Sequence, residues 1–249
     1  MIFNVQYTIM YPINKISNDA NALIDNQSKV IMFWTPRAAC TASVSMFYKN
    51  MKIFDDVIKK HKWIHDHRPI FYKQFGRINN QLVADPQYFK FKMVRDPYKR
   101  AVSNYFVLVS NLHRGKVRFD ISFMEYLKRI KNGFDFGPSI NYHSIKQTSN
   151  WDKFMDKIVK IENVGLGLQE IDTKCKTQFK QSYDYITKSQ NDHVRVKNTK
   201  INYFVGNMKA SNIIKLSPDY VWFYNEKIRK LVEDIYGQDI VNYGYEYPF

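Results

Sequence analysis

Two segments of the chain share one pattern, a short apolar run followed by a turn and then by apolar residues at helical spacing. Residues 29–34 are apolar and rich in β-branched and aromatic side chains, which predicts a strand buried on both faces. In residues 88–94 apolar positions alternate with lysines, the period of two that is typical of a strand. Helices are expected to follow at residues 41–51 and through residues 100–108.

The turns carry signals for the start of each helix. Thr41 is an expected N-cap, and Pro97 fits a first helical turn. Strands that alternate with helices indicate an α/β fold whose parallel sheet has helices on both faces. Weaker patterns predict a strand at residues 63–68, a loop from there to residues 85–86, a helix at 119–131, a strand at 157–163 and a helix at 220–236 that Gly237 ends.

Length and composition favour one globular domain. The chain has 249 residues, of which 45% are hydrophobic and 16% aromatic, enough for a sizeable core. We expect a single domain over residues 1–249, in which residues 1–28 form an N-terminal extension that no pattern defines. The start of the chain is a poor signal peptide, and no run of about 18 apolar residues occurs. A soluble, cytoplasmic protein that does not enter the membrane is expected.

The net charge of +15 indicates an anionic partner without choosing one. Nucleic acid, an acidic membrane face, an acidic glycan and a polyphosphate cofactor are all compatible with it, as is a solvated lysine surface. The two cysteines, Cys40 and Cys175, make neither a disulfide framework nor a metal site and are expected to be reduced thiols. Residues 193–197 form a basic alternating stretch, suited to an anion or to a protected strand edge.

Residues 35–41, after the first strand, have the layout of an anion-binding loop. Small side chains let backbone N–H groups and a helix N-terminus approach an anion, and Arg37 and Thr41 add donors. The loop is not a Walker A motif, which needs two glycines, because the first glycine of the chain is Gly76. An ordinary strand-to-helix turn remains the alternative.

Residues 95–105, after the second strand, are more specific. Arg95 stands at the strand end and Ser103 two turns into the helix, with Lys99 on the same helical face. A guanidinium and a hydroxyl are a suitable pair for a phosphate monoester. An ion pair between Arg95 and Asp96 is the alternative.

Together the two loops resemble the sulfotransferases that use 3′-phosphoadenosine 5′-phosphosulfate, closest to their carbohydrate branch. Residues 35–43 resemble the family's 5′-phosphosulfate loop, Pro-Lys-x-x-Cys-Thr, and residues 95–105 match its 3′-phosphate motif, Arg-Asp-Pro-x-x-Arg-x-x-Ser-x-Tyr, in full. His143, Gln147 and residues 160–163 resemble further family segments. In order, these matches run from about residue 29 to the C-terminus.

The resemblance implies a three-layer α/β/α fold with a central parallel sheet, of the P-loop NTPase-like sulfotransferase type, and transfer of sulfuryl without a metal. Arg37 stands where the family has lysine and becomes the catalytic cation. The general base is expected at His65, or else His67, which would share one face of a strand. His143 would contact the acceptor. The residues implied for the nucleotide are Pro36, Arg37, Ala38, Ala39, Cys40, Thr41, Ala42, Arg95 and Ser103.

The acceptor and three alternatives stay open. The acceptor needs a free hydroxyl, and the basic charge favours an acidic glycan, although a protein tyrosine or a small alcohol also fits. A basic nucleic-acid-binding protein is the main alternative. Against a nucleic acid partner, the basic residues are dispersed and no recognised nucleic-acid-binding motif occurs in the sequence. The others are a nucleotide kinase and a relative made inactive by Arg37.

Overall fold

A four-stranded mixed sheet forms the centre of the protein. The computed structural model describes residues 21–191, 201–214, 216 and 218–249. The strand order is β1-β2-β3-β4, in which β2, β3 and β4 run parallel and β1 runs antiparallel to β2. The predicted α/β fold is confirmed, with an antiparallel strand added from residues that the sequence pattern left undefined. The strands are β1 (Ala22–Asp25), β2 (Val30–Trp34), β3 (Phe89–Val94) and β4 (Lys157–Lys160).

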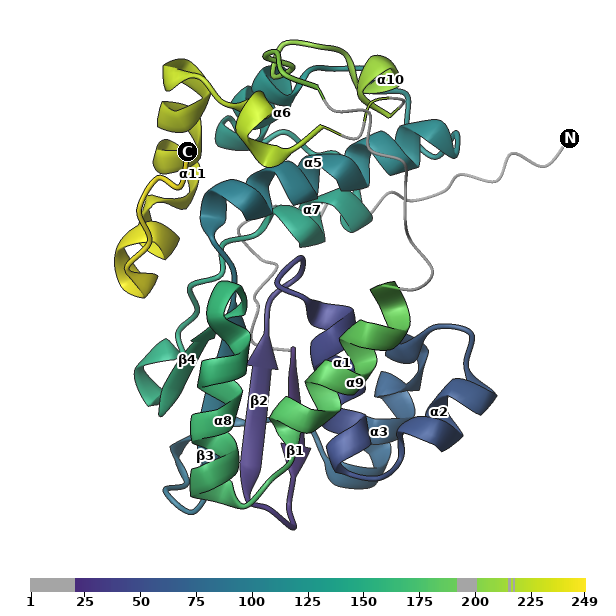
Figure 1. Cartoon of the computed structure of the whole chain (residues 1–249), viewed down its shortest axis with the longest axis vertical. Coiled ribbons are helices and arrows are strands. Elements are labelled where there is room, and N and C mark those ends of the chain that lie inside the picture. The colour runs from purple at the N-terminus through teal and green to yellow at the C-terminus, as the bar shows by residue number, and fades with distance from the viewer. Residues whose placement is uncertain (1–20, 192–200, 215, 217) are drawn as a thin grey trace, which may run out of the picture.

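Three helices lie over one face of the sheet (Figure 1). They are α1 (Cys40–Asn50), α8 (Val164–Cys175) and α9 (Phe179–Asn191). Phe47 of α1 stacks on Phe179 of α9 with ring centroids 5.6 Å apart, and Phe179 in turn contacts Phe91 of β3 at 5.5 Å. Aromatic side chains therefore join this helical layer to the middle of the sheet.

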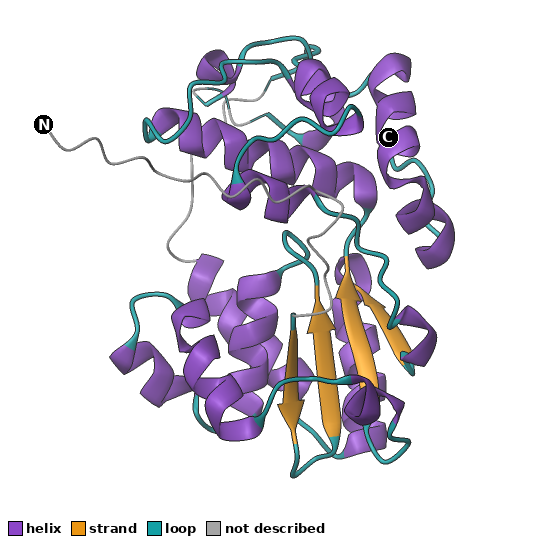
Figure 2. Ribbon diagram, turned by 180° about the vertical axis from the view of Figure 1, so that it is seen from behind, coloured by secondary structure: helices purple, strands orange, loops and turns teal. Residues whose placement is uncertain are grey.

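Shorter segments cover the opposite face, which Figure 2 shows from behind. Phe33 of β2 and Lys92 of β3 are register partners. Because side chains alternate along a strand and Phe91 faces the three helices, Lys92 lies on this opposite face. Trp151 packs edge-on against Phe33 at 5.5 Å and donates from its indole N–H to Asn80 of α4. Lys92 is 2% exposed and paired with Asp152, so even the lysine face of β3 is buried. The other helices between β2 and β3 in the chain are α2 (Phe54–Lys60), α3 (Arg68–Phe75) and α4 (Asn80–Ala84).

A second group of helices sits beyond the end of the sheet toward which β2 points (Figure 1). Its own core includes Tyr105, Phe123 and Phe223, whose rings contact one another at 5.4–6.2 Å. The carboxyl ends of the parallel strands therefore face a packed helical layer. The helices are α5 (Pro97–His113), α6 (Phe123–Lys131), α7 (Pro138–Ser144), α10 (Ala210–Ile213) and α11 (Glu226–Tyr243).

The structure confirms both strand-loop-helix units and corrects several other predictions. Residues 63–68 are not a strand, since Ile64–His67 form a 3₁₀ helix (η3), and the loop predicted after them contains α3 and α4. The predicted strand at 157–163 ends at Lys160 and continues as the 3₁₀ helix η5 (Ile161–Asn163). Thr41 does not cap α1, because Ala39 occupies that position. The basic stretch 193–197 lies outside the described residues.

Two helix boundaries also differ from the prediction. The helix expected at 119–131 begins at Phe123, after the N-cap Ser122. The helix expected at 220–236 is split into the 3₁₀ helix η6 (Tyr220–Phe223) and α11, which Asn225 caps. Gly237 does not end α11, which deviates locally at Tyr236 and continues to Tyr243, where Gly244 adopts the left-handed conformation.

Replacing Gly237 by alanine tests this boundary. A Cβ at Gly237 would meet nothing within 4 Å, and glycine inside a helix costs about 0.5–1 kcal/mol relative to alanine. We expect Gly237→Ala to raise the free energy of unfolding by that amount in urea denaturation. Gly244→Ala should lower it, because φ is +58° there. A destabilised Gly237→Ala protein would show that the helix ends at residue 237.

Candidate functional site

The loop between β2 and α1 is strained and lacks a side-chain cap. Arg37 and Ala39 both have positive φ, 67° and 54°, a conformation that costs non-glycine residues about 1–2 kcal/mol each. The amide of Ala38 donates to the Thr35 carbonyl at 3.1 Å, which closes the turn, and Ala38 is fully buried. No side chain caps the N-terminus of α1. This loop therefore points a helix N-terminus and Arg37 toward the helical layer beyond the sheet.

Asp96 shapes the second loop. Its carboxylate accepts hydrogen bonds from the amides of Tyr98 and Lys99, at 2.8 and 3.0 Å, and so caps α5. Burial raises the pKa of Asp96, although the bond from the Lys99 amide opposes this shift. The alternative of an Arg95–Asp96 ion pair does not occur among the described contacts. Arg95 is thereby left to interact elsewhere.

The two loops meet through Arg37, Arg95 and Ser103. Arg37 donates from Nε to Ser103 Oγ at 2.9 Å, and Arg95 donates from Nη1 to the Arg37 carbonyl at 3.0 Å. Arg95 also donates from Nη2 to Tyr220 Oη at 2.8 Å. Its Nε is buried and has no hydrogen-bond partner in the described ranges of the chain. Side chains from two turns 58 residues apart thus form one site.

A third guanidinium, that of Arg100, lies behind this site. Arg100 is 1% exposed and donates to the carbonyls of Pro36 and Ile145, at 3.0 and 2.6 Å. Within the described part of the chain, Arg37, Arg95 and Arg100 form no ion pair with a carboxylate. Burial lowers the pKa of Arg37, and the charges of Arg95 and Arg100 lower it further. Three positive charges held by neutral oxygens are chemically suited to bind an anion.

Gln147 fixes the distance between the two loops. Its Oε1 accepts from Thr35 Oγ1 at 3.1 Å and from the Arg95 amide at 2.9 Å, and its Nε2 donates to the Arg95 carbonyl at 2.7 Å. The backbone amide of Gln147 donates to the carboxylate of Asp239 on α11. Both Gln147 and Asp239 are fully buried. The ends of β2 and β3 are therefore clamped by one amide side chain.

His65 lines a cavity of about 800 Å³. It is 6% exposed, and neither ring nitrogen has a hydrogen-bond partner among the described residues. Burial, assisted by the charge of Arg68, lowers the pKa of His65 to about 4, so its imidazole is neutral at pH 7. Asn21 Nδ2 is likewise buried, with no partner in the part of the chain that the structure describes. The cavity is lined by Asn21, Ala22, Trp63, His65, Asp66, Arg68, Pro69, Tyr72, Arg77, Ile78 and Tyr142.

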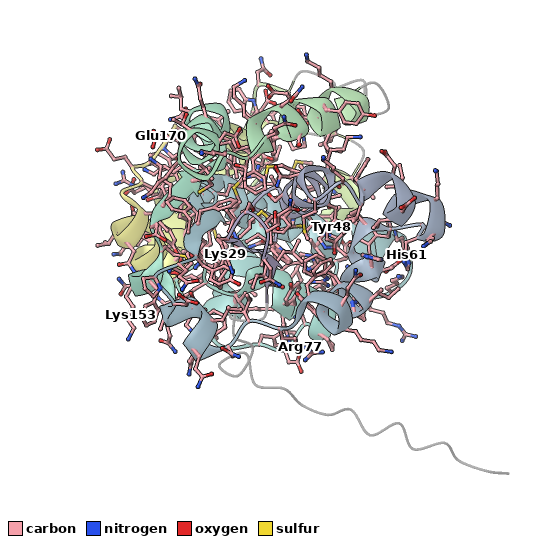
Figure 3. The ribbon with its side chains drawn as sticks, turned by 90° about the horizontal axis from the view of Figure 1, so that it is seen from below. Lys29, Tyr48, His61, Arg77, Lys153 and Glu170 are labelled. Carbon is pink, nitrogen blue, oxygen red and sulfur yellow. The ribbon has the colours of Figure 1, made fainter. Side chains whose placement is uncertain are left out.

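His67 lies elsewhere, because η3 replaces the predicted strand and separates the two histidines. Its Nδ1 is 3.2 Å from His61 Nε2, and its ring packs edge-on against Tyr48 at 5.5 Å. Figure 3 shows His61 toward the margin of the molecule and Tyr48 nearer its centre. His67 is not among the residues that line the cavity. Its surroundings do not connect it to Arg37.

His143 contacts Arg100, whose Nη2 donates to the His143 carbonyl at 3.3 Å. Its Nδ1 is 2.6 Å from the Ser139 carbonyl, which it can reach as a donor, and its ring contacts that of the neighbouring Tyr142. Burial lowers the pKa of His143, and the charges of Arg37 and Arg100 lower it further. Tyr142 donates to Asn21 Oδ1 at 2.6 Å in the cavity wall. His143 therefore lies close enough to Arg37 to interact with its charge.

The structure brings together most of the predicted site residues and adds others. Residues 36–42 form the first loop and the first turn of α1, and Arg37 contacts both Ser103 and Arg95. Sequence reasoning missed Tyr220, which has no local signal. Asp239 did have one, because it is an acidic residue between buried Tyr236 and Tyr243 on the apolar face of α11.

Two further observations concern metals and membranes. Among the described residues, His, Cys, Asp and Glu nowhere gather in threes that could hold a metal ion. Within the same residues, the helices are all too short or too polar to cross a membrane.

Comparison with known proteins gives one family. The model of the sulfotransferase family matches residues 20–246, which is nearly the whole chain. No curated protein and no solved structure shows a significant match.

The folded protein keeps His65 neutral, and this should make its free energy of unfolding depend on pH. The unfolded chain takes up this proton below about pH 6.5, whereas the folded protein resists it down to about pH 4. Stability is therefore lost as the pH falls through this window, by about 3 kcal/mol at most. We expect His65→Leu to flatten the decline of the unfolding free energy between pH 7 and pH 4, measured in urea. Parallel declines in the two proteins would contradict the burial of a neutral His65.

Proposed function

Because the chain belongs to the sulfotransferase family, we propose that it transfers a sulfuryl group from 3′-phosphoadenosine 5′-phosphosulfate to a hydroxyl group of a carbohydrate acceptor. The family alone implies sulfuryl transfer. The choice of donor and acceptor is argued below from the two loops and from the cavity beside them.

The observation that carries the donor is the group of three arginines without a carboxylate partner. Among the described residues, Arg37, Arg95 and Arg100 have no negatively charged partner. A nucleotide with phosphate at both ends would supply one. Arg95 Nε is buried and has no hydrogen-bond partner among the described residues, so a phosphate oxygen that reaches it would satisfy a donor that otherwise costs about 1–3 kcal/mol.

Each loop is assigned one end of the nucleotide. Residues 36–42, with their backbone amides and Arg37, would hold the 5′-phosphosulfate, and Arg95 with Ser103 would hold the 3′-phosphate. In the structure Arg37 donates to Ser103. The two ends of the nucleotide would therefore be bound by side chains that also contact each other.

The bound donor would supply an activated sulfuryl group, and the protein supplies charge and proton transfer. Arg37 stabilises the negative charge that grows on the leaving phosphate oxygen. His65 accepts the proton of the acceptor hydroxyl as the new oxygen–sulfur bond forms and the sulfur–oxygen bond to phosphate breaks. His65 is neutral and therefore ready to accept it, and negative charge nearby would raise its low pKa in the complex.

The cavity beside His65 supports an acidic glycan as the acceptor. Arg68 donates to two neutral oxygens, the His65 carbonyl and Asn21 Oδ1, at 3.3 and 3.4 Å. Arg77 is exposed at the margin of the molecule (Figure 3), and its guanidinium lies 5.6 Å from the ring centroid of Tyr72. Neither arginine has an ion-pair partner among the described residues. Trp63, 55% exposed, offers an aromatic face on which a sugar ring can stack.

Nucleotide binding tests the donor. In calorimetry we expect 3′-phosphoadenosine 5′-phosphate to bind about 10–100-fold more tightly than 5′-AMP, because the 3′-phosphate adds charge-assisted hydrogen bonds. Arg95→Ala should reduce its affinity to that of 5′-AMP. Arg114→Ala removes an equal charge after the end of α5 and should have no effect.

Equal affinity of the wild-type protein for the two nucleotides would overturn the assignment of the donor. Tight binding of ATP that depends on Mg²⁺ would instead favour a kinase. Thermal unfolding of each variant separates loss of binding from loss of fold.

Transfer of radiolabelled sulfate tests the acceptor. We expect a polysaccharide rich in uronic acid to be sulfated with a KM about tenfold lower than its carboxyl-reduced form, since Arg68 and Arg77 would bind the carboxylates. Arg68→Gln should reduce this difference, since Arg77 remains, without changing the affinity for 3′-phosphoadenosine 5′-phosphate. Lys73→Gln, on the same helix but away from the cavity lining, is the matched control. Equal use of both polysaccharides by the wild type would contradict an acidic acceptor.

A further inference from the structure

We propose that Tyr220 is a positioning residue that aligns Arg95 for the 3′-phosphate and so sets the selectivity for that phosphate. The inference rests on the proposed function, because it assumes that Arg95 binds the 3′-phosphate. It concerns a residue from the C-terminal part of the chain, 125 positions after Arg95.

Tyr220 touches Arg95 in two ways. Its Oη accepts a hydrogen bond from Arg95 Nη2 at 2.8 Å, and its ring centroid lies 5.4 Å from Arg95 Cζ. The hydroxyl fixes the direction of one nitrogen, and the ring attracts the guanidinium through a cation–π interaction. Together with the bond from Nη1 to the Arg37 carbonyl, these contacts hold both ends of the guanidinium fork.

The charge of the atoms that hold Arg95 affects how strongly it can bind an anion. Both oxygens that hold Arg95 are neutral, so its full charge remains for an anion. A guanidinium carries five N–H groups, and the two bonds described use two of them. The Nε–H group is one of the other three, and it is buried with no partner among the residues that the structure describes. A carboxylate in the place of Tyr220 would fix Arg95 equally well but would cancel the charge that binds phosphate.

The fold holds Tyr220 firmly in this position. It is the first residue of η6, whose last residue, Phe223, is fully buried against the rings of Phe106 and Phe123 at 5.7 and 5.4 Å. The Trp222 carbonyl accepts from the Val205 amide at 2.7 Å, which joins η6 to a neighbouring segment. The backbone that carries Tyr220 is therefore held by contacts that do not involve Arg95.

Tyr220→Phe isolates the hydroxyl, because it keeps the ring and the packing. We expect its affinity for 3′-phosphoadenosine 5′-phosphate to fall about tenfold in calorimetry, the loss of one hydrogen bond to a charged group. Its affinity for 5′-AMP should stay unchanged, since that nucleotide has no 3′-phosphate. In an Arg95→Ala background, Tyr220→Phe should have no further effect, because the residue acts through Arg95.

Tyr224→Phe is the matched control. Its hydroxyl donates to the Tyr98 carbonyl at 2.7 Å and is buried away from Arg95, so its loss should lower the melting temperature and leave the ratio of the two affinities intact. A Tyr220→Phe protein that keeps the wild-type ratio, or loses affinity for both nucleotides equally, would overturn the inference. A wild-type protein that binds both nucleotides equally would instead overturn the proposed donor.

Discussion

Three guanidinium groups that share one region without a carboxylate partner among the described residues are the constraint on which the rest of the site depends. Arg37, Arg95 and Arg100 repel one another, and burial lowers the pKa of Arg37 in the same sense. The fold tolerates this because backbone carbonyls and hydroxyls accept their hydrogen bonds. These neutral acceptors satisfy several of the donors and leave the positive charge uncancelled, which suits the anion with two phosphate ends that we propose.

Two buried polar contacts keep the arginines in place. Gln147 joins the end of β2 to the end of β3, and Asp239 of α11 holds the Gln147 amide, so the C-terminal helix is connected to both loops. A buried amide and a buried carboxylate are costly unless they are hydrogen-bonded, and here Oε1 and Nε2 of Gln147 and both carboxylate oxygens of Asp239 have partners. The same helix contributes Tyr236, whose ring centroid lies 5.7 Å from Arg100 Cζ. The helical layer beyond the sheet therefore supports the site as much as the sheet does.

Local patterns predicted the parts of the fold in which burial and chain direction agree. The apolar run of β2 and the alternation in β3 identified both strands, and the turns after them carried Arg37, Arg95 and Ser103. The prediction was wrong where the sequence of a short segment is compatible with more than one conformation. The alternation around His65 and His67 suits a strand, but the chain forms η3 there. Gly237 suits a helix end, yet apolar residues continue the buried face of α11 beyond it.

The sequence by itself determined the two strand-loop-helix units and the residue types in their loops, because these depend on neighbours along the chain. Only the tertiary structure decided that Arg37 contacts Ser103, that Gln147 joins both loops and that His65, not His67, lies beside the cavity. It alone brought Tyr220 to Arg95. Such contacts join residues 52 to 125 positions apart, and they are fixed by how the two helical layers pack around the sheet, which no local pattern records.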